Sequence, residues 1–314
     1  MRRLIIALSI LACVPTIAGA KTYKEMFGVD APGDAKFKAI LESLDFKQDK
    51  FPLPGANANL TAPKGFYYLN AADSAKVLTE IWGNPPGSTQ GVLATIFPAQ
   101  LPPENSQSWT AVITYSHEGY VSDADAASTD FDAVLTELKT ATRESSAERE
   151  RQGYEPITLV GWASPPRYEL TTHSLHWARD LIFGKDMNAA HTLNYQLRIL
   201  GREGILEMNF VAGIDQLQAV KDSIPAVTGL VTYDVGKKYE DFRDGDAVAA
   251  YGLAGLIATA AGAKVAAKLG FLAIALAFLK KGGFILAFAA AAIFRPIAKL
   301  FKRNSDNVPP HDTV

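Results

Sequence analysis

The chain gathers groups that could transfer protons or bind a metal between residues 117 and 125. His117 and Glu118 are adjacent, and Asp123 and Asp125 follow in the same short segment. Imidazole beside carboxylates is a common arrangement for general acid–base chemistry and for metal ligation. The same pattern also suits a turn whose short polar side chains cap the next helix. We favour the turn and expect no metal site, because two aspartates fall far short of the about six oxygens of a calcium loop.

A second group of candidate binding residues combines aromatic rings with one guanidinium group. Trp162, Arg167, Tyr168 and Trp177 fall within one stretch of the chain, and such side chains can line a groove. Aromatic residues near prolines also pack in cores and loops, which is the interpretation we favour. If the two groups meet in one cleft, the candidate site for a ligand or partner comprises His117, Glu118, Tyr120, Asp123, Asp125, Trp162, Arg167, Tyr168 and Trp177.

The sequence offers little else for catalysis. His173 and His176 are three residues apart in a predicted strand, so their side chains point to opposite faces and do not share a metal. The chain contains no Gly-x-Ser-x-Gly, no phosphate-binding glycine loop and no His-Glu-x-x-His. We therefore expect no cofactor and assign no catalytic residue.

The elements that must position these residues alternate irregularly between strands and helices. The clearest is a hairpin at 191–212, where apolar and polar residues alternate on both sides of a glycine-flanked turn. Such an order, without regular strand–helix–strand units, predicts an α+β fold with helices packed on an antiparallel sheet. Helical segments are predicted at 21–50, 71–82, 131–152 and 214–224, and further strands at 57–61, 66–69, 91–97, 109–115, 157–162, 170–183 and 229–233.

Charge divides the chain into three regions. Residues 1–20 carry +2, residues 247–314 carry +6, and residues 21–246 between them carry −10. An acidic central region argues against nucleic acid as a partner, because phosphate contacts need a basic surface. The only cysteine is Cys13, so residues 21–246 have no thiol for a disulfide, a metal or catalysis.

The N-terminus predicts export. Arg2 and Arg3 precede an apolar run that ends in Ala18-Gly19-Ala20, the pattern of a signal peptide cleaved after residue 20. We therefore expect residues 21–246 to form an α+β domain outside the cytoplasm.

The C-terminal region predicts a membrane anchor. Residues 247–303 are rich in Ala, Gly and Leu and also carry eight Lys and Arg residues without any acidic residue, a combination typical of membrane-associated helices. Lys280, Lys281, Gly282 and Gly283 interrupt the apolar stretch, which leaves one tilted span, two short helices or interfacial helices as alternatives. A pair of buried core helices is a further alternative. By the positive-inside rule, residues 304–314 form a polar cytoplasmic tail.

Several stretches resemble a known bacterial family. The run from His191 to Leu206, HTLNYQLRILGREGIL, resembles the predicted membrane-anchored proteins catalogued as domain of unknown function twenty-one sixty-seven. The resemblance implies an envelope protein with a C-terminal anchor and brings no catalytic residues. The TAPKGF sequence at 61–66 also resembles small α+β domains of the PsbP-like type, a fold-level analogy only. Further matching stretches are 82–87, 119–126, 160–168 and 249–253.

These observations predict a protein of the cytoplasmic membrane whose main domain faces the periplasm or the cell exterior. We expect a non-enzymatic binding or interaction domain, with the lipid bilayer and another envelope protein as partners and no nucleic acid. The alternative is an envelope hydrolase or a metal-dependent enzyme that uses the segment from His117 to Asp125.

Overall fold

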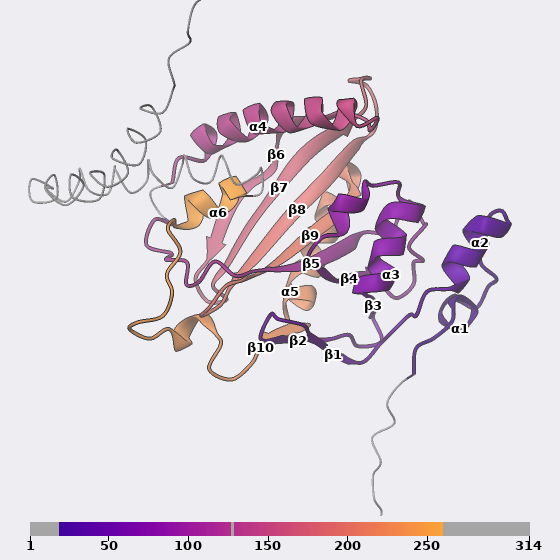
Figure 1. Cartoon of the computed structure of the whole chain (residues 1–314), viewed down its shortest axis with the longest axis horizontal. Helices are drawn as coiled ribbons and strands as arrows, with labels where there is room; N and C mark the ends of the chain where they lie inside the picture. The colour runs from indigo at the N-terminus through magenta and orange to yellow at the C-terminus, as the bar shows by residue number, and fades with distance from the viewer. Residues whose placement is uncertain (1–18, 127–128, 260–314) are drawn as a thin grey trace, which may run out of the picture.

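The computed structural model describes residues 19–126 and 129–259, which form an α+β domain around a seven-stranded antiparallel sheet (Figure 1). Each neighbouring pair of strands in this sheet is antiparallel, which confirms the predicted α+β class with helices packed on an antiparallel sheet. The strands lie in the order β3 (Phe66–Asn70), β4 (Val92–Pro98), β5 (Thr110–Ser116), β9 (Ile205–Gly213), β8 (His191–Leu200), β7 (Ser174–Phe183) and β6 (Ile157–Glu169).

The hairpin of β8 and β9 lies near the centre of this sheet. Tyr195 pairs with Phe210 and Leu197 with Met208, so the apolar positions of both strands share one face, as their alternation predicts. These side chains are buried in the largest hydrophobic core of the domain.

The edge strand β6 is longer than the sequence predicts. The predicted strand at 157–162 continues to Glu169 through Pro165 and Pro166, and its pairing with β7 shifts register three times on the way. Prolines fit there because an edge strand and its bulges do not need every backbone N–H for pairing. The next strand begins at Ser174 rather than at residue 170, because the intervening residues form the turn.

One face of the large sheet packs against a helix and a smaller sheet. Val220, Ile224 and Val227 of the helix point into the core, in agreement with the helix predicted at 214–224. The smaller sheet includes an edge strand that was not predicted because Pro52 and Pro54 read as breaks. The elements of this layer are β1 (Lys50–Leu53), β2 (Ala58–Thr61), β10 (Val231–Tyr233), the 3₁₀ turn η3 (Ile214–Gln216) and α5 (Leu217–Thr228).

The other face is covered at its two ends by separate helices (Figure 1). One end carries α3 and a π-helical turn over β3 and β4, and the other carries α4 and α6 over β6 and β7. The N-terminal lead-in, predicted as one helical segment, forms two short helices, because Gly28 ends the first at φ 74° and Asp34 caps the second. The bounds are α1 (Tyr23–Phe27), α2 (Ala35–Glu42), α3 (Ala71–Lys76), η1 (Val77–Ile81), η2 (Pro86–Thr89), α4 (Phe131–Arg151), η4 (Tyr239–Asp241) and α6 (Leu253–Thr259).

Between these two helical layers, the centre of the sheet carries a polar strip. Asn194 accepts hydrogen bonds from Arg179 and Gln196 at 3.0 and 2.9 Å, and Arg198 forms an ion pair with Glu207 at 3.1 Å. These groups lie on the face opposite the main core, yet Asn194, Gln196 and Arg198 are at most 7% exposed. We define the polar strip by Thr114, Arg179, Asn194, Gln196, Arg198, Glu207 and Asn209.

The domain includes the first residues of the segment predicted as the anchor. Leu253, Leu256 and Ile257 of α6 are almost fully buried in the second hydrophobic core, beside α4. The predicted signal peptide, except its last two residues, and the predicted anchor beyond residue 259 lie outside the described residues. Within 19–126 and 129–259, no helix combines the length and the apolar character that crossing a membrane requires.

Candidate functional site

The segment from His117 to Asp125 places its side chains in three different surroundings. His117 and Glu118 are exposed: the imidazole lies edge-on to Tyr115 with ring centroids 4.7 Å apart, and Glu118 accepts a hydrogen bond from Ser116 at 2.9 Å.

Gly119 and Tyr120 bind the segment to the C-terminal part of the domain. Tyr120 donates a backbone hydrogen bond to Ala247 at 2.8 Å and accepts one from Ala249 at 2.9 Å. At Gly119, with φ 80°, an added Cβ would lie 2.6 Å from the carbonyl oxygen of Ala247. Only glycine fits this close approach.

Asp123 meets residues of the second predicted group. Its carboxylate accepts a hydrogen bond from the Tyr168 hydroxyl at 2.8 Å, and the same hydroxyl lies 3.2 Å from Nδ1 of His173. Burial, and then the hydrogen bond to Asp123, raise the pKa of the Tyr168 hydroxyl above its usual range. Tyr239 completes this cluster, because its ring lies against His173 and its hydroxyl accepts from the Asp123 backbone N–H. The predicted groups thus meet through the hydrogen bond between Asp123 and Tyr168, and Tyr120 joins the same cluster because its ring stacks on Tyr239 with centroids 4.5 Å apart.

Asp125 acts as a helix cap contributed from a distant part of the chain. Its carboxylate accepts hydrogen bonds from the backbone N–H groups of Leu253 at 2.9 Å and Ala254 at 3.3 Å, which begin α6. Within the described part of the chain, no group of three His, Cys, Asp or Glu side chains is placed to hold a metal ion. The arrangement around Asp125 is that of a structural cap.

The two tryptophans of the second group also have structural surroundings. Trp177 is fully buried on β7, with the Arg198 guanidinium 5.4 Å from the centre of its ring. Trp162 is half-buried and donates its indole N–H to the carbonyl of Phe131, where α4 begins. Arg167 points elsewhere, toward a cavity described below.

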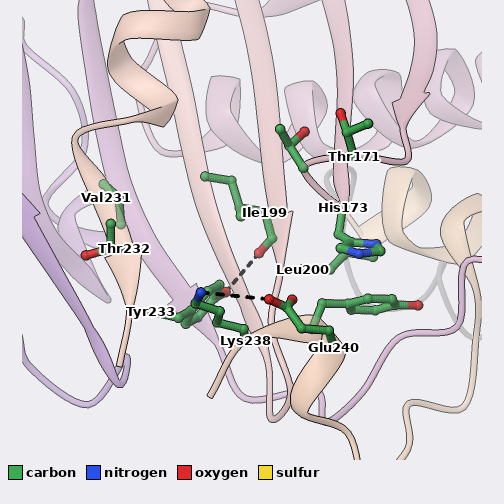
Figure 2. A pocket seen from close by; sticks show the side chains of 11 residues that line it. Thr171, His173, Ile199, Leu200, Val231, Thr232, Tyr233, Lys238 and Glu240 are labelled. Atoms are coloured by element: carbon green, nitrogen blue, oxygen red, sulfur yellow. Dashed lines mark hydrogen bonds and ion pairs between the residues drawn. The ribbon is translucent and has the colours of Figure 1, made fainter. Parts of the chain in front are cut away.

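A shallow hollow lies next to His173, at the end of the sheet where β6 turns into β7 (Figure 2). Its volume is about 240 Å³. Lys238 and Glu240, which line it, lie 3.8 Å apart and so offset each other's charge, as the dashed line in Figure 2 marks. The hollow is smaller than the roughly 300–1,000 Å³ that is typical of ligand sites.

A second cavity lies between the sheet and α5, and its volume of about 390 Å³ falls within that range. We call it the β6–α5 pocket. The strands contribute polar groups to one wall, and the helix contributes one cation and two apolar residues to the other. It is lined by Ser164, Pro165, Arg167, His176, Tyr195, Lys221, Ile224 and Pro225.

The polar groups of the β6–α5 pocket are held in place by buried contacts. His176 and Tyr195 are only 6% and 4% exposed. Nε2 of His176 lies 2.8 Å from the Ser174 hydroxyl, and Nδ1 lies 3.4 Å from the Tyr195 hydroxyl. Burial, and then the nearby charge of Arg167, lower the pKa of His176 to about 4, so the imidazole is neutral at neutral pH. Burial also raises the pKa of the Tyr195 hydroxyl, which therefore keeps its proton.

Of the nine candidate residues, Arg167 alone lines this pocket. The sequence interpretation missed Ser164, His176, Tyr195 and Lys221 as its neighbours. Two of them could have been noticed in the sequence. Tyr195 and His176 occupy core-facing positions of strands, where an apolar residue is the usual occupant. Lys221 gives no such signal, because it lies on a helix far from β6 in the sequence.

The fold and the pocket define an antiparallel α+β domain with a cavity of ligand size between sheet and helix. The chain belongs to the family described as "Protein of unknown function (DUF2167)", whose model matches residues 45–291. The resemblance noted for 191–206 is thereby confirmed. A search of curated proteins finds no match. The solution structure of cyanobacterial PsbP (CyanoP) from Synechocystis sp. PCC 6803 is similar at 12% identity and a TM-score of 0.33, over 59% of this chain and 91% of that one. A likeness of this extent gives no basis for a functional assignment.

Proposed function

We propose that this protein is a non-enzymatic binding protein of the bacterial envelope, whose domain takes a small ligand in the β6–α5 pocket. The observation that carries the proposal is the pocket itself. It combines a volume typical of ligand sites with buried, fixed polar groups and apolar walls, the composition expected of a small-molecule site.

The surroundings of the predicted acid–base residues support binding over catalysis. Asp125 is engaged by α6, and Asp123 by Tyr168 and Tyr239. His117 and Glu118 are exposed, and their contacts include Tyr115 and Ser116. A hydrolase or metal-dependent enzyme built on this segment would need these groups to face one shared position for substrate.

Export and membrane attachment are part of the proposal and rest on the sequence. The arginines and apolar run before residue 20 support export, and the apolar, basic composition of 260–303 supports attachment to the cytoplasmic membrane. The test is fractionation of cells followed by protease treatment of spheroplasts. We expect the chain in the membrane fraction and the domain digested from outside. A protease-protected domain, or a chain in the soluble fraction, would contradict this part.

Ligand binding is tested with a soluble aromatic probe and a variant that fills the pocket. The full chain is titrated with naphthalene-2-sulfonamide by calorimetry. Ser164→Trp places an indole in the pocket, whereas Val160→Trp places the same ring at an exposed position of β6 away from it. We expect the unchanged chain and Val160→Trp to bind the probe, and Ser164→Trp to bind it at least about tenfold more weakly. Equal binding by all three proteins would refute a ligand site in this pocket.

A further inference from the structure

The charges that line the β6–α5 pocket are all positive. Arg167 approaches from β6 and Lys221 from α5, and no acidic side chain among the described residues lines the cavity. Arg167 forms a single ion pair with Glu169 at 3.3 Å outside the lining, and both side chains are substantially exposed. Lys221 makes no ion pair within the part of the chain that the structure describes. This cationic pair belongs to a region whose net charge is −10.

The buried Tyr195 hydroxyl can donate to a group in the pocket in one tautomer of His176. Nε2 of His176 is 2.8 Å from the Ser174 hydroxyl, which is the closer of the two contacts of this ring. When Nε2 accepts from Ser174, Nδ1 carries the proton of the neutral ring and donates to the Tyr195 oxygen. The Tyr195 hydroxyl then has its own proton free for a group inside the pocket. An anion in the pocket favours this tautomer, because it accepts that proton.

Apart from Ser164, the rest of the lining is apolar and stiff. Pro165, Ile224 and Pro225 offer no side-chain hydrogen bonds, and the two proline rings have little freedom to lose when a ligand binds. A free inorganic anion would leave this surface uncovered. The two kinds of wall together fit a molecule with an anionic group at one end and an apolar body.

We propose that the β6–α5 pocket binds an organic anion, with its charged group between Arg167 and Lys221 and hydrogen-bonded by Tyr195, and its apolar body against Ile224 and the prolines. The inference rests on the proposed function and names its ligand class. The shared chemistry is a carboxylate, sulfonate or phosphate monoester on an apolar body. A guanidinium group pairs with such anions through two parallel charge-assisted hydrogen bonds, which are stronger than the bonds that a neutral group of the same shape accepts.

The test compares three probes on the full chain. Naphthalene-2-sulfonate carries the charge and the apolar body, naphthalene-2-sulfonamide carries the body alone, and inorganic sulfate carries the charge alone. We expect the sulfonate to bind about tenfold or more tightly than either of the others, and its affinity to weaken as salt is added. If the sulfonamide or inorganic sulfate binds as tightly as the sulfonate, the pocket is not specific for an organic anion and the proposal is wrong.

Charge-removing variants locate the effect. The double variant Arg167→Gln, Lys221→Gln should bind the sulfonate about tenfold or more weakly while its affinity for the sulfonamide stays the same. Lys139→Gln removes one charge from an exposed position on α4 and should change neither affinity. Tyr195→Phe should weaken binding of the sulfonate and leave binding of the sulfonamide unchanged. If Ser164→Trp abolishes binding of both naphthalenes but the charge variants have no effect, the pocket binds ligands and the anion class is wrong. If Ser164→Trp changes nothing, the proposed function itself fails.

Discussion

Replacement of Asp125 by alanine separates a structural role from a catalytic one. Asp125 accepts two hydrogen bonds from the first turn of α6, and loss of such a cap costs about 0.5–2 kcal/mol. Over its described residues, Leu253–Thr259, α6 is also held in place by its packing in the second hydrophobic core. Leu253, Leu256 and Ile257 are each at most 1% exposed, and burial of each stabilises by about 1.5–3 kcal/mol. Because this packing outweighs the cap, we expect α6 to remain docked and the free energy of unfolding to fall by about 1–2 kcal/mol.

Urea unfolding of the full chain, followed by tryptophan fluorescence, measures this change. Asp125→Asn keeps one acceptor oxygen and should lose less stability than the alanine variant. Asp130→Ala is the matched control, because Asp130 caps the exposed start of α4 with bonds of 3.1 and 3.0 Å, and it should cost about 1 kcal/mol. An Asp125→Ala variant within about 0.5 kcal/mol of the unchanged protein would refute the cap, since that is the ordinary effect of a surface substitution.

Three further predictions concern buried charge and backbone geometry. Burial lowers the pKa of His176 to about 4, so between about pH 6.5 and 4 the unfolded chain binds a proton that the folded chain does not. As the pH falls through this window, the free energy of unfolding should therefore decrease by about 2–3 kcal/mol more than it does in the His176→Gln variant. Urea titrations at pH 7 and pH 4 measure this difference. Glu207→Gln removes the ionic partner of buried Arg198 and should lower the free energy of unfolding by about 2–3 kcal/mol; a thermal melt at unchanged stability would contradict the ion pair. Gly119→Ala should lower the free energy of unfolding by about 2–3 kcal/mol, and Gly153→Ala by about 1 kcal/mol. Both glycines have positive φ, but only at Gly119 would an added Cβ lie 2.6 Å from a carbonyl oxygen. Equal losses of stability would show that this close contact is unimportant.

Local patterns in the sequence were sufficient for most of the sheet. Alternation at 191–212 gives the register of β8 and β9, because a shift by one residue would move Leu197 out of the main core and its polar neighbours into it. For the face of the sheet opposite the main core, the same alternation wrongly predicts exposure to solvent. Asn194 and Gln196 look like solvent-facing residues, but they hydrogen-bond to each other within the buried polar strip. A single strand does not reveal which helices will cover it.

The candidate site was harder to predict, because its parts come from distant segments. Arg167 was a reasonable candidate, but its partner Lys221 reaches the pocket only through the packing of α5 on the sheet. Asp125 was predicted to lie in a turn before the next helix, but its carboxylate caps a helix that begins far away in the sequence, at Leu253. The residues from Leu253 to Ala258 have the same apolar composition whether they lie in a core or in a membrane, so composition alone could not place them.

The irregular course of β6 bears on how copies of this protein behave when crowded together. An exposed edge of a sheet offers free N–H and C=O groups to any strand that lies against it, which is a common first step of aggregation. Pro165 and Pro166 remove donors from the outer edge of β6, and its three shifts of register prevent another strand from pairing along its whole length. At the opposite edge, β3 spans five residues only and presents little to pair with. The large sheet therefore ends on both sides in strands that discourage chain-to-chain association, even though its interior strands are long and regular.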